Sequence, residues 1–292
     1  MKKQVDYSAY LYILPAFILF SVYVAYPIIY NVYLSLLKWD GISSDQIFIG
    51  LKNYLSFFND KYFFLSIRNV FYWLLLTTSI QMSLGLILAN SLWKQIFGRN
   101  TIKAIAFAPC MIMPVIIGVV FGHIFETFDG ILNQSLRSIG LAKIALSWLA
   151  DPSIAIFTLI AINIWQWTGF SMVMYLAGMT NIPTELYEAA HIDGASSTRR
   201  FFSLTVPLLR NTHLSLIVLH IIGTLRTFDL VWIISRGGPA HTTEVIATYL
   251  FRVAFFENRM GYAGALSVFL LFLAMTLTIV QIRLYTRRDR VR

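Results

Sequence analysis

Six long runs of almost uncharged residues are the feature that most restricts what this chain can fold into. The runs cover residues 11–37, 70–93, 104–125, 154–179, 211–235 and 260–282. Each reaches the roughly 20 residues that a helix needs to cross the hydrocarbon core of a bilayer. Because lipid offers the backbone no hydrogen-bonding partner, a spanning segment satisfies its own N–H and C=O groups as a helix. The sequence therefore predicts an all-α integral membrane protein with six transmembrane helices in a single domain over residues 1–292.

Composition supports lipid as the main solvent. Of the 292 residues, 58% are hydrophobic and 13% are charged, against about 25% charged in a typical soluble domain. The formal net charge of +9 could indicate nucleic-acid binding, but basic cytoplasmic loops explain it without a nucleic-acid partner. A single cysteine, Cys110, excludes an internal disulfide and a cysteine-based metal site. The five histidines show no metal-ligand spacing with acidic residues, so we predict no metal site.

The distribution of lysine and arginine sets the expected orientation. With the N-terminus inside, the inner segments hold more than half of the 23 basic residues, although the outer loops are longer in total. The inner residues are Lys2, Lys3, Lys94, Arg99, Lys103, Arg199, Arg200, Arg210, Arg283, Arg287, Arg288, Arg290 and Arg292. Cytoplasmic loops of membrane proteins carry this excess, so both termini are expected in the cytoplasm. The first run is too long for the apolar region of a signal peptide, about 7–15 residues, and we interpret it as a retained helix.

Prolines interrupt two of the runs. Pro15 and Pro27 lie in the first, and Pro109 and Pro114 lie in the third. Each proline removes a backbone hydrogen bond and favours a kink. Kinked or broken helices are typical of a protein that encloses a cavity and moves, although static kinks absorbed by packing remain an alternative.

The longest inner segment, residues 180–210, carries the strongest local pattern. Pro183 suits the first turn of a helix, and the acidic Glu185 and Glu188 suit the positive end of its dipole. Gly194 is a natural stop, since glycine enters the left-handed conformation without penalty. We therefore predict a short helix over 183–193, a sharp reversal, and a second amphipathic stretch over 197–204.

This segment resembles the signature of the ABC-importer permease family, whose nearest branch is the maltose-type, binding-protein-dependent sugar permeases. The family pattern is Glu-Ala-Ala, three residues, Gly, nine residues and Ile-x-Leu-Pro. Here Glu188-Ala189-Ala190 is followed by Gly194 and, after nine residues, by Leu204-Thr205-Val206-Pro207. The likeness continues at Asp193-Gly194-Ala195, Phe228-Asp229, Arg236-Gly237-Gly238-Pro239 and residues 261–267. Arg236 is a departure, because many relatives have a third glycine there.

The resemblance implies a six-helix permease subunit in the bacterial inner or cytoplasmic membrane, which moves carbohydrate, such as an oligosaccharide, by alternating access. The coupling residues that it implies are Glu188, Ala189, Ala190, Asp193, Gly194 and Pro207. Its implied partners are a second homologous permease, an ABC ATPase dimer, an extracytoplasmic solute-binding protein and membrane lipid. The sequence has no G-x-x-x-x-G-K-[ST], the phosphate-binding loop of ATPases. We therefore expect no catalytic residue or cofactor in this chain, with ATP and Mg on the partner ATPase subunits.

Polar residues inside the predicted spans are the candidate substrate pathway. They are Asn163, Trp165, Gln166 and Trp167 in the fourth span and Arg226 and Asp229 in the fifth. Amides combined with flat apolar rings suit a carbohydrate, although Asn and Gln also join helices and tryptophans also simply pack. Arg226 and Asp229 lie three residues apart and are expected on one helix face. They would form either a gate or substrate contact, or a structural pair that fixes helix packing.

Three other functions stay open at this level. An ABC importer for another solute, such as glycerol phosphate or a peptide, would keep the same coupling segment. A stand-alone secondary transporter would show an internal inverted repeat or a coupling-ion site, and the sequence shows neither. A membrane-embedded enzyme would need a convergent cluster of Asp, Glu or His, which is also absent from the sequence.

Overall fold

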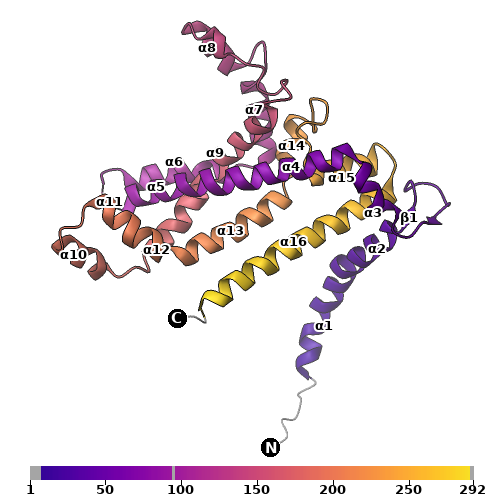
Figure 1. Ribbon diagram of the computed structural model, residues 1–292, viewed down its shortest axis with the longest axis horizontal. Coiled ribbons are helices and arrows are strands. Elements are labelled where there is room, and N and C mark those ends of the chain that lie inside the picture. Colours follow the sequence, from indigo (N-terminus) through magenta and orange to yellow (C-terminus); the bar gives the residue numbers. More distant parts are fainter. Residues whose placement is uncertain (1–7, 94–95, 290–292) are drawn as a thin grey trace, which may run out of the picture. The chain divides into compact units, whose positions relative to one another are not determined.

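The computed structural model describes residues 8–93 and 96–289, and its regular structure is almost entirely helical (Figure 1). Of the basic residues that set the expected orientation, Lys2, Lys3, Lys94, Arg290 and Arg292 lie outside these described ranges. The chain forms two compact units. One comprises Met1–Lys61 and Leu250–Leu273, and the other comprises Tyr62–Tyr249 and Ala274–Arg292.

The first unit contains the N-terminal helices and a small hairpin. Its elements are α1 (Ser8–Phe20), a π-helical turn (Ser21–Ala25), α2 (Tyr26–Ser35), β1 (Leu37–Lys38), β2 (Ile47–Phe48), α3 (Lys52–Ser56) and a 3-10 turn (Phe57–Asn59), with the end of α15 (Ile246–Phe255) and the first part of α16 (Met260–Asp289). β1 and β2 pair antiparallel, with Leu37 opposite Phe48. The buried Asn53 holds the junction of α2 and β1, because its side-chain nitrogen donates to the carbonyls of Ser35 and Leu37, both at 2.8 Å.

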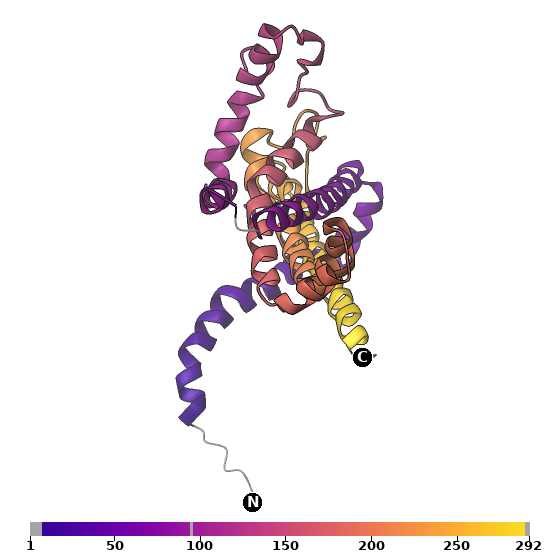
Figure 2. The same ribbon diagram turned by 90° about the vertical axis from the view of Figure 1, so that its left-hand side faces the viewer.

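The second unit contains the remaining helices. They are α4 (Lys61–Leu76), a π-helical turn (Thr77–Gln81), α5 (Met82–Trp93), α6 (Arg99–Phe107), a 3-10 turn (Ala108–Met111), α7 (Pro114–Ile124), α8 (Ile131–Ser138), a 3-10 turn (Ala142–Ile144), α9 (Ala155–Met179), α10 (Thr184–Ile192), α11 (Ser197–Arg200), a π-helical turn (Phe201–Thr205), α12 (Val206–Leu208), α13 (Arg210–Leu225) and α14 (Asp229–Ile234). α15 begins and α16 ends in this unit. In the view of Figure 2, α7 leads away from α9 towards α8.

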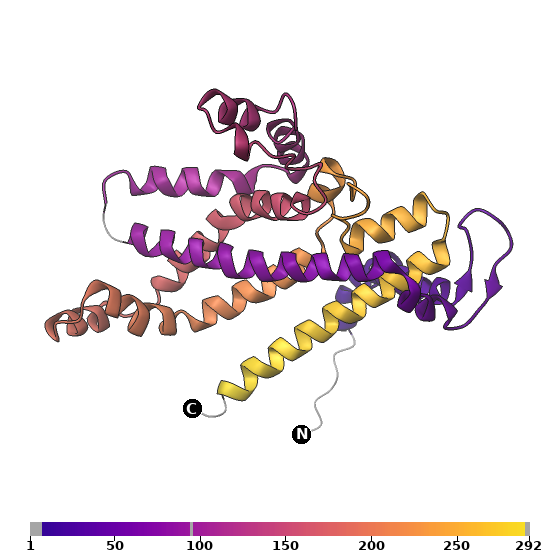
Figure 3. The same ribbon diagram turned by 45° about the horizontal axis from the view of Figure 1, so that its top comes forward.

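The core of the second unit forms where α5 packs along α9 (Figure 3). Its buried residues include Ala89 on α5 and Met172, Tyr175 and Met179 on α9, which meet Leu216 of α13. Small residues allow the helices to approach one another, as is typical of packing in membranes. A Cβ added to Gly169 of α9 would overlap the carbonyl oxygen of Ala106, and one added to Gly85 of α5 would overlap Ser171.

Within the described residues, five helical segments are long and apolar enough to cross a bilayer, and a bent pair makes a sixth. The five are Tyr12–Ser35, Lys61–Trp93, Ala155–Met179, Arg210–Ile234 and Met260–Gln281. The bent pair, Arg99–Met111 and Pro114–Ile124, meets at 96°. The all-α fold and the number of apolar segments agree with the sequence prediction. The third span, predicted as one helix over 104–125, is instead broken.

The break in the third span has a physical cause in its prolines. Residues Ile112 and Met113 are extended between the two helices, and Pro114 begins α7. The residue before a proline avoids the α-helical region, so the helix ends there and restarts. At Pro27 and Pro207 the response is milder, because the carbonyl four residues earlier falls within a π-helical turn that accommodates the proline ring.

The close approach at Gly169 gives a first prediction. We expect Gly169→Ala to lower stability by about 1–3 kcal/mol, because the added methyl group forces α9 away from α6. Thermal unfolding of the purified protein in detergent would measure this loss as a drop in Tm. Gly122→Ala is the control, since nothing lies within 4 Å of its added Cβ. An equal Tm in both variants would contradict the packing argument.

Candidate docking loop and central cavity

The segment of residues 180–210, termed the coupling loop, contains the predicted short helix. α10 begins directly after Pro183 and ends at Ile192, one residue inside the predicted range at each end. Gly194 has a φ of +74°. Its N–H donates to the carbonyl of His191 at 3.0 Å, and the N–H of Ala195 donates to that of Ala190 at 2.9 Å. These two bonds form a Schellman motif, which reverses the chain after α10.

The residues of the predicted signature lie on the surface of this loop. Glu188, Ala189, Asp193, Gly194 and Pro207 are exposed, and Ala190 is half-buried. Large apolar side chains accompany them, with Ile192 86% and Phe202 65% exposed. Exposed apolar groups of this kind are typical of a surface that contacts another protein or the membrane. Among the described residues, Glu188 forms no ion pair, so its carboxylate can accept hydrogen bonds from a basic partner.

The inner side of the loop is tied to the membrane helices by residues that the sequence did not single out. The hydroxyl of Tyr187, on α10, lies 3.0 Å from that of the buried Thr205. His213 of α13 contacts the carbonyl of Val206 at 3.1 Å and the hydroxyl of Tyr175, on α9, at 2.7 Å. α10 is therefore linked to α9 and α13 through side chains as well as through the backbone.

A cavity of about 400 Å³ lies between α4, α9, α13 and α14. Its lining residues are Trp73, Thr77, Gln81, Pro114, Asn163, Gln166, Trp167, Phe170, Leu216, Leu219, His220, Ile222, Gly223, Thr224, Arg226, Thr227, Phe228, Asp229 and Leu230. Five of the six residues predicted for the substrate pathway are among them. The cavity therefore brings together candidates that lie on two different predicted spans.

Trp165 is the candidate that lies elsewhere. Asn163, Gln166 and Trp167 are three and four residues apart, so they share one face of α9, whereas Trp165 falls on another. Trp165 is 47% exposed, and its ring packs edge-on against Phe121 at 5.0 Å between centroids. The prediction that it lines the pathway with its neighbours is not supported by this geometry.

Gln166 combines two roles in this arrangement. It is buried, and its side-chain nitrogen donates to the carbonyl of Ile112 at 3.2 Å. Ile112 lies at the break of the third span, where the N–H of Ile116, its helical donor, bonds the carbonyl of Met113 instead, at 3.0 Å. The amide therefore supports the broken helix at the edge of the cavity, as well as lining the cavity itself.

The expected placement of Arg226 and Asp229 on one helix face is wrong. α13 ends at Leu225, and α14 begins at Asp229, so the helix is interrupted between the two charges. Both side chains are exposed and line the cavity, and neither forms an ion pair within the described part of the chain. A charge inside a membrane protein is turned towards a partner or a water-filled space, and these two are turned towards the cavity.

One wall of the cavity is formed by α4 and the following π-helical turn, and the sequence analysis did not predict it. Trp73, Thr77 and Gln81 recur every four residues and are all buried. Gln81 is 3% exposed, and its side-chain oxygen has no hydrogen-bonding partner among the residues that the structure describes. A buried acceptor without a partner is costly, so this oxygen is available to a ligand in the cavity. The four-residue spacing of polar and aromatic side chains within an apolar run was the available signal.

Comparison with known proteins agrees with this architecture. A family model described as "Binding-protein-dependent transport system inner membrane component" matches residues 81–290. The probable ABC transporter permease YurN of Bacillus subtilis is 34% identical over 287 residues, which cover 98% of each chain. The lactose transport system permease LacF of Rhizobium radiobacter is 32% identical, over 99% of this chain and 97% of the relative.

A solved structure shares the whole fold. It is that of a bacterial alginate ABC transporter in complex with an alginate pentasaccharide-bound periplasmic protein. One of its chains matches with a TM-score of 0.83 at 23% identity, over 97% of this chain and 95% of that one.

The helices, the coupling loop and the cavity define the membrane-spanning permease subunit of an ABC transporter, a non-catalytic component located in the cell membrane. The chain belongs to the family of binding-protein-dependent transport system inner membrane components. The resemblance that rested on the Glu188 signature is thereby confirmed at the level of the family.

Proposed function

We propose that the protein is the permease subunit of an ATP-driven, binding-protein-dependent carbohydrate importer, and that the sugar crosses the membrane through the central cavity by alternating access. The observation that carries this proposal is the lining of the cavity. Three amides, Gln81, Asn163 and Gln166, face the same space as two indole rings, Trp73 and Trp167. Amides exchange hydrogen bonds with sugar hydroxyls, and aromatic faces cover the apolar side of a sugar ring.

Relatives support a carbohydrate cargo. LacF is described as a lactose transport permease, and the solved neighbour imports an acidic polysaccharide, alginate. The cavity also contains Arg226, which would suit an anionic solute such as glycerol phosphate, but Asp229 offsets that charge within the same lining. A neutral, hydroxyl-rich cargo therefore fits the lining better than an anion does.

The coupling loop supports the proposal that the energy comes from other chains. We propose that it lies on the cytoplasmic side, with both termini, and that Glu188, Ala189, Ala190, Asp193, Gly194 and Pro207 dock onto one subunit of an ABC ATPase dimer. ATP and Mg would bind to those subunits. A second homologous permease would complete the pathway, and a solute-binding protein would deliver the sugar from outside.

The docking proposal predicts that Gly194→Val weakens ATPase association by about 5–30-fold. A β-branched residue in the left-handed conformation costs roughly 1–2 kcal/mol, and here it would distort the reversal after α10. Co-purification of the ATPase subunit with the variant permease measures the loss, and Glu188→Lys is expected to act in the same direction by reversing the charge.

Gly140→Val is the matched control for this experiment. Gly140 also follows a helix with a positive φ, +80°, and a Schellman pair of hydrogen bonds, and an added Cβ meets nothing within 4 Å at either glycine. It lies after α8, outside the coupling loop. Normal ATPase association in Gly194→Val and Glu188→Lys would refute the docking proposal.

The cargo proposal predicts that Gln81→Leu raises the KM for sugar uptake about tenfold, because a substrate hydroxyl loses its acceptor. Uptake of labelled disaccharides and oligosaccharides, with glycerol phosphate in the same panel, first identifies the cargo of the unaltered transporter. Gln134→Leu is the control for the loss of an amide group, because Gln134 is an exposed glutamine on α8, outside the cavity lining. Uptake of glycerol phosphate alone, or an unchanged KM in Gln81→Leu, would contradict the proposal.

A further inference from the structure

The α14–α15 loop, residues 235–245, has an unusual backbone conformation at three residues that are not glycine. Arg236, Ala240 and His241 have φ values of 49°, 47° and 64°, in the left-handed region that residues other than glycine rarely enter. Such conformations persist only where the surrounding contacts determine them, and they concentrate at functional positions. The contacts that fix this loop are therefore informative.

Within the loop, hydroxyl groups join its two ends. The hydroxyl of Ser235, at the end of α14, lies 2.8 Å from that of the buried Thr243 and donates to the carbonyl of Val231 at 2.9 Å. Thr243 in turn donates to the carbonyl of Gly238 at 2.7 Å. The central part of the loop is thus fixed to the last turn of α14.

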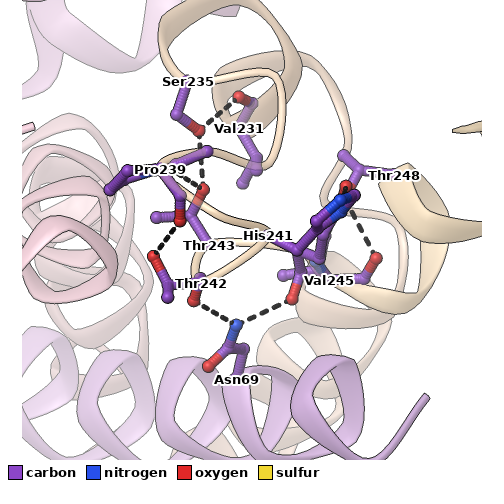
Figure 4. Close-up of polar contacts among 11 residues, drawn as sticks. Asn69, Val231, Ser235, Pro239, His241, Thr242, Thr243, Val245 and Thr248 are labelled. Carbon is purple, nitrogen blue, oxygen red and sulfur yellow. Dashed lines mark hydrogen bonds and ion pairs between the residues drawn. The ribbon is translucent and has the colours of Figure 1, made fainter. Parts of the chain in front are cut away.

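Asn69 connects the same loop to α4 (Figure 4). This side chain is fully buried, and its nitrogen donates to the carbonyls of Thr242 and Glu244, both at 2.8 Å. Both hydrogens of the amide are used, one on each side of Thr243. We call this pair of hydrogen bonds the Asn69 clamp.

The clamp continues the wall of the cavity. Asn69 is four residues before Trp73 and belongs to the same buried stripe of α4 as Thr77 and Gln81. A four-residue stripe drifts by about 40° per step on an α-helix. The π-helical turn at Thr77–Gln81 has more residues per turn and counteracts the drift.

The opposite wall starts from the other end of the loop. α14 follows the break at Arg226 and places Phe228, Asp229 and Leu230 in the cavity lining. Its last residue precedes Ser235, whose hydroxyl contacts that of Thr243, and Thr243 lies between the two residues whose carbonyls form the clamp. Asn69 therefore connects the α4 wall to the α14 wall through a loop whose backbone is held in an unfavourable conformation.

We propose that Asn69 is a positioning residue, which latches the α4 and α14 walls together and closes the outer end of the cavity while the transporter rests. Asn69 is not one of the residues that line the cavity, and it acts through the loop. This inference rests on the orientation and the pathway proposed above. Loss of the clamp removes the Asn69 donor from the carbonyls of Thr242 and Glu244, which is costly at a buried acceptor, and frees the loop from α4.

Accessibility of the cavity from outside tests the latch without knowledge of the cargo. Gly223→Cys, on a Cys110→Ser background, is the reporter, because Gly223 lines the cavity and an added Cβ meets nothing within 4 Å. The assembled transporter, without ATP or binding protein, is treated from outside with a membrane-impermeant thiol reagent. Asn69→Asp is expected to raise the labelling rate about tenfold, since a carboxylate loses both donors and repels both carbonyls.

Asn53→Asp is the matched control. Asn53 is also buried and also donates from one nitrogen to two carbonyls at 2.8 Å, but it holds the junction of α2 and β1. A merely structural loss would affect assembly in both variants, whereas the latch affects labelling only in Asn69→Asp. Asn69→Ala, which removes the donors without adding charge, gives the same expectation if Asn69→Asp does not assemble.

Three outcomes would overturn the proposal. They are an unchanged labelling rate in the Asn69 variants, an equal rise in Asn53→Asp, and failure of both Asn69 variants to assemble where Asn53→Asp assembles, which would make Asn69 a folding residue. If the unaltered transporter imports no sugar but the labelling contrast is present, the cargo proposal fails and the latch stands.

Discussion

The backbone hydrogen bonds that lipid cannot supply are the constraint on which the rest of this structure depends. Breaks in the spans occur where protein groups replace the missing partners. At the third span the carbonyl of Ile112 receives the amide of Gln166. At the fifth, the hydroxyl of Thr227 donates to the carbonyl of Gly223 at 3.0 Å. Both breaks border the cavity, because only there can irregular backbone and polar side chains satisfy one another.

Two helices, α9 and α13, connect the coupling loop to the cavity. α13 runs from the coupling loop to the break at Arg226, and α9 accompanies it from Asn163 at the cavity to Tyr175, which contacts His213. The coupling loop and the cavity are therefore attached to the same two helices. α10 is thus connected to the cavity walls through elements that are continuous and well packed, without any further domain between them.

Sequence reasoning predicted the features that depend on local chemistry. Pro183 and Gly194 bound a helix because a missing N–H and a left-handed turn are properties of single residues, and apolar length alone indicated the spans. Sequence reasoning did not predict that the helix is interrupted between Arg226 and Asp229, because that interruption depends on tertiary contacts. Trp165 was grouped with its neighbours by proximity along the chain, where the helical period separates it from them.

Gln81 and Asn69 were missed for a related reason. Each is a single amide in an apolar run, and its meaning comes from partners far away in sequence, such as Thr242, 173 residues from Asn69. Only the folded chain shows that the side-chain nitrogen of Asn69 donates two hydrogen bonds. It also shows that the side-chain oxygen of Gln81 has no partner among the described residues.

The separation of faces on α9 has a consequence for how such a permease can diversify. Insertion into the bilayer depends on the summed hydropathy of the helix, and most of its residues stay apolar whatever occupies Asn163 and Gln166. The tight approach at Gly169 fixes the spacing of the helices independently of both. If the cavity binds the cargo as proposed, specificity can drift at a position such as Asn163 while the determinants of insertion and of helix spacing remain untouched, so one scaffold can serve many solutes.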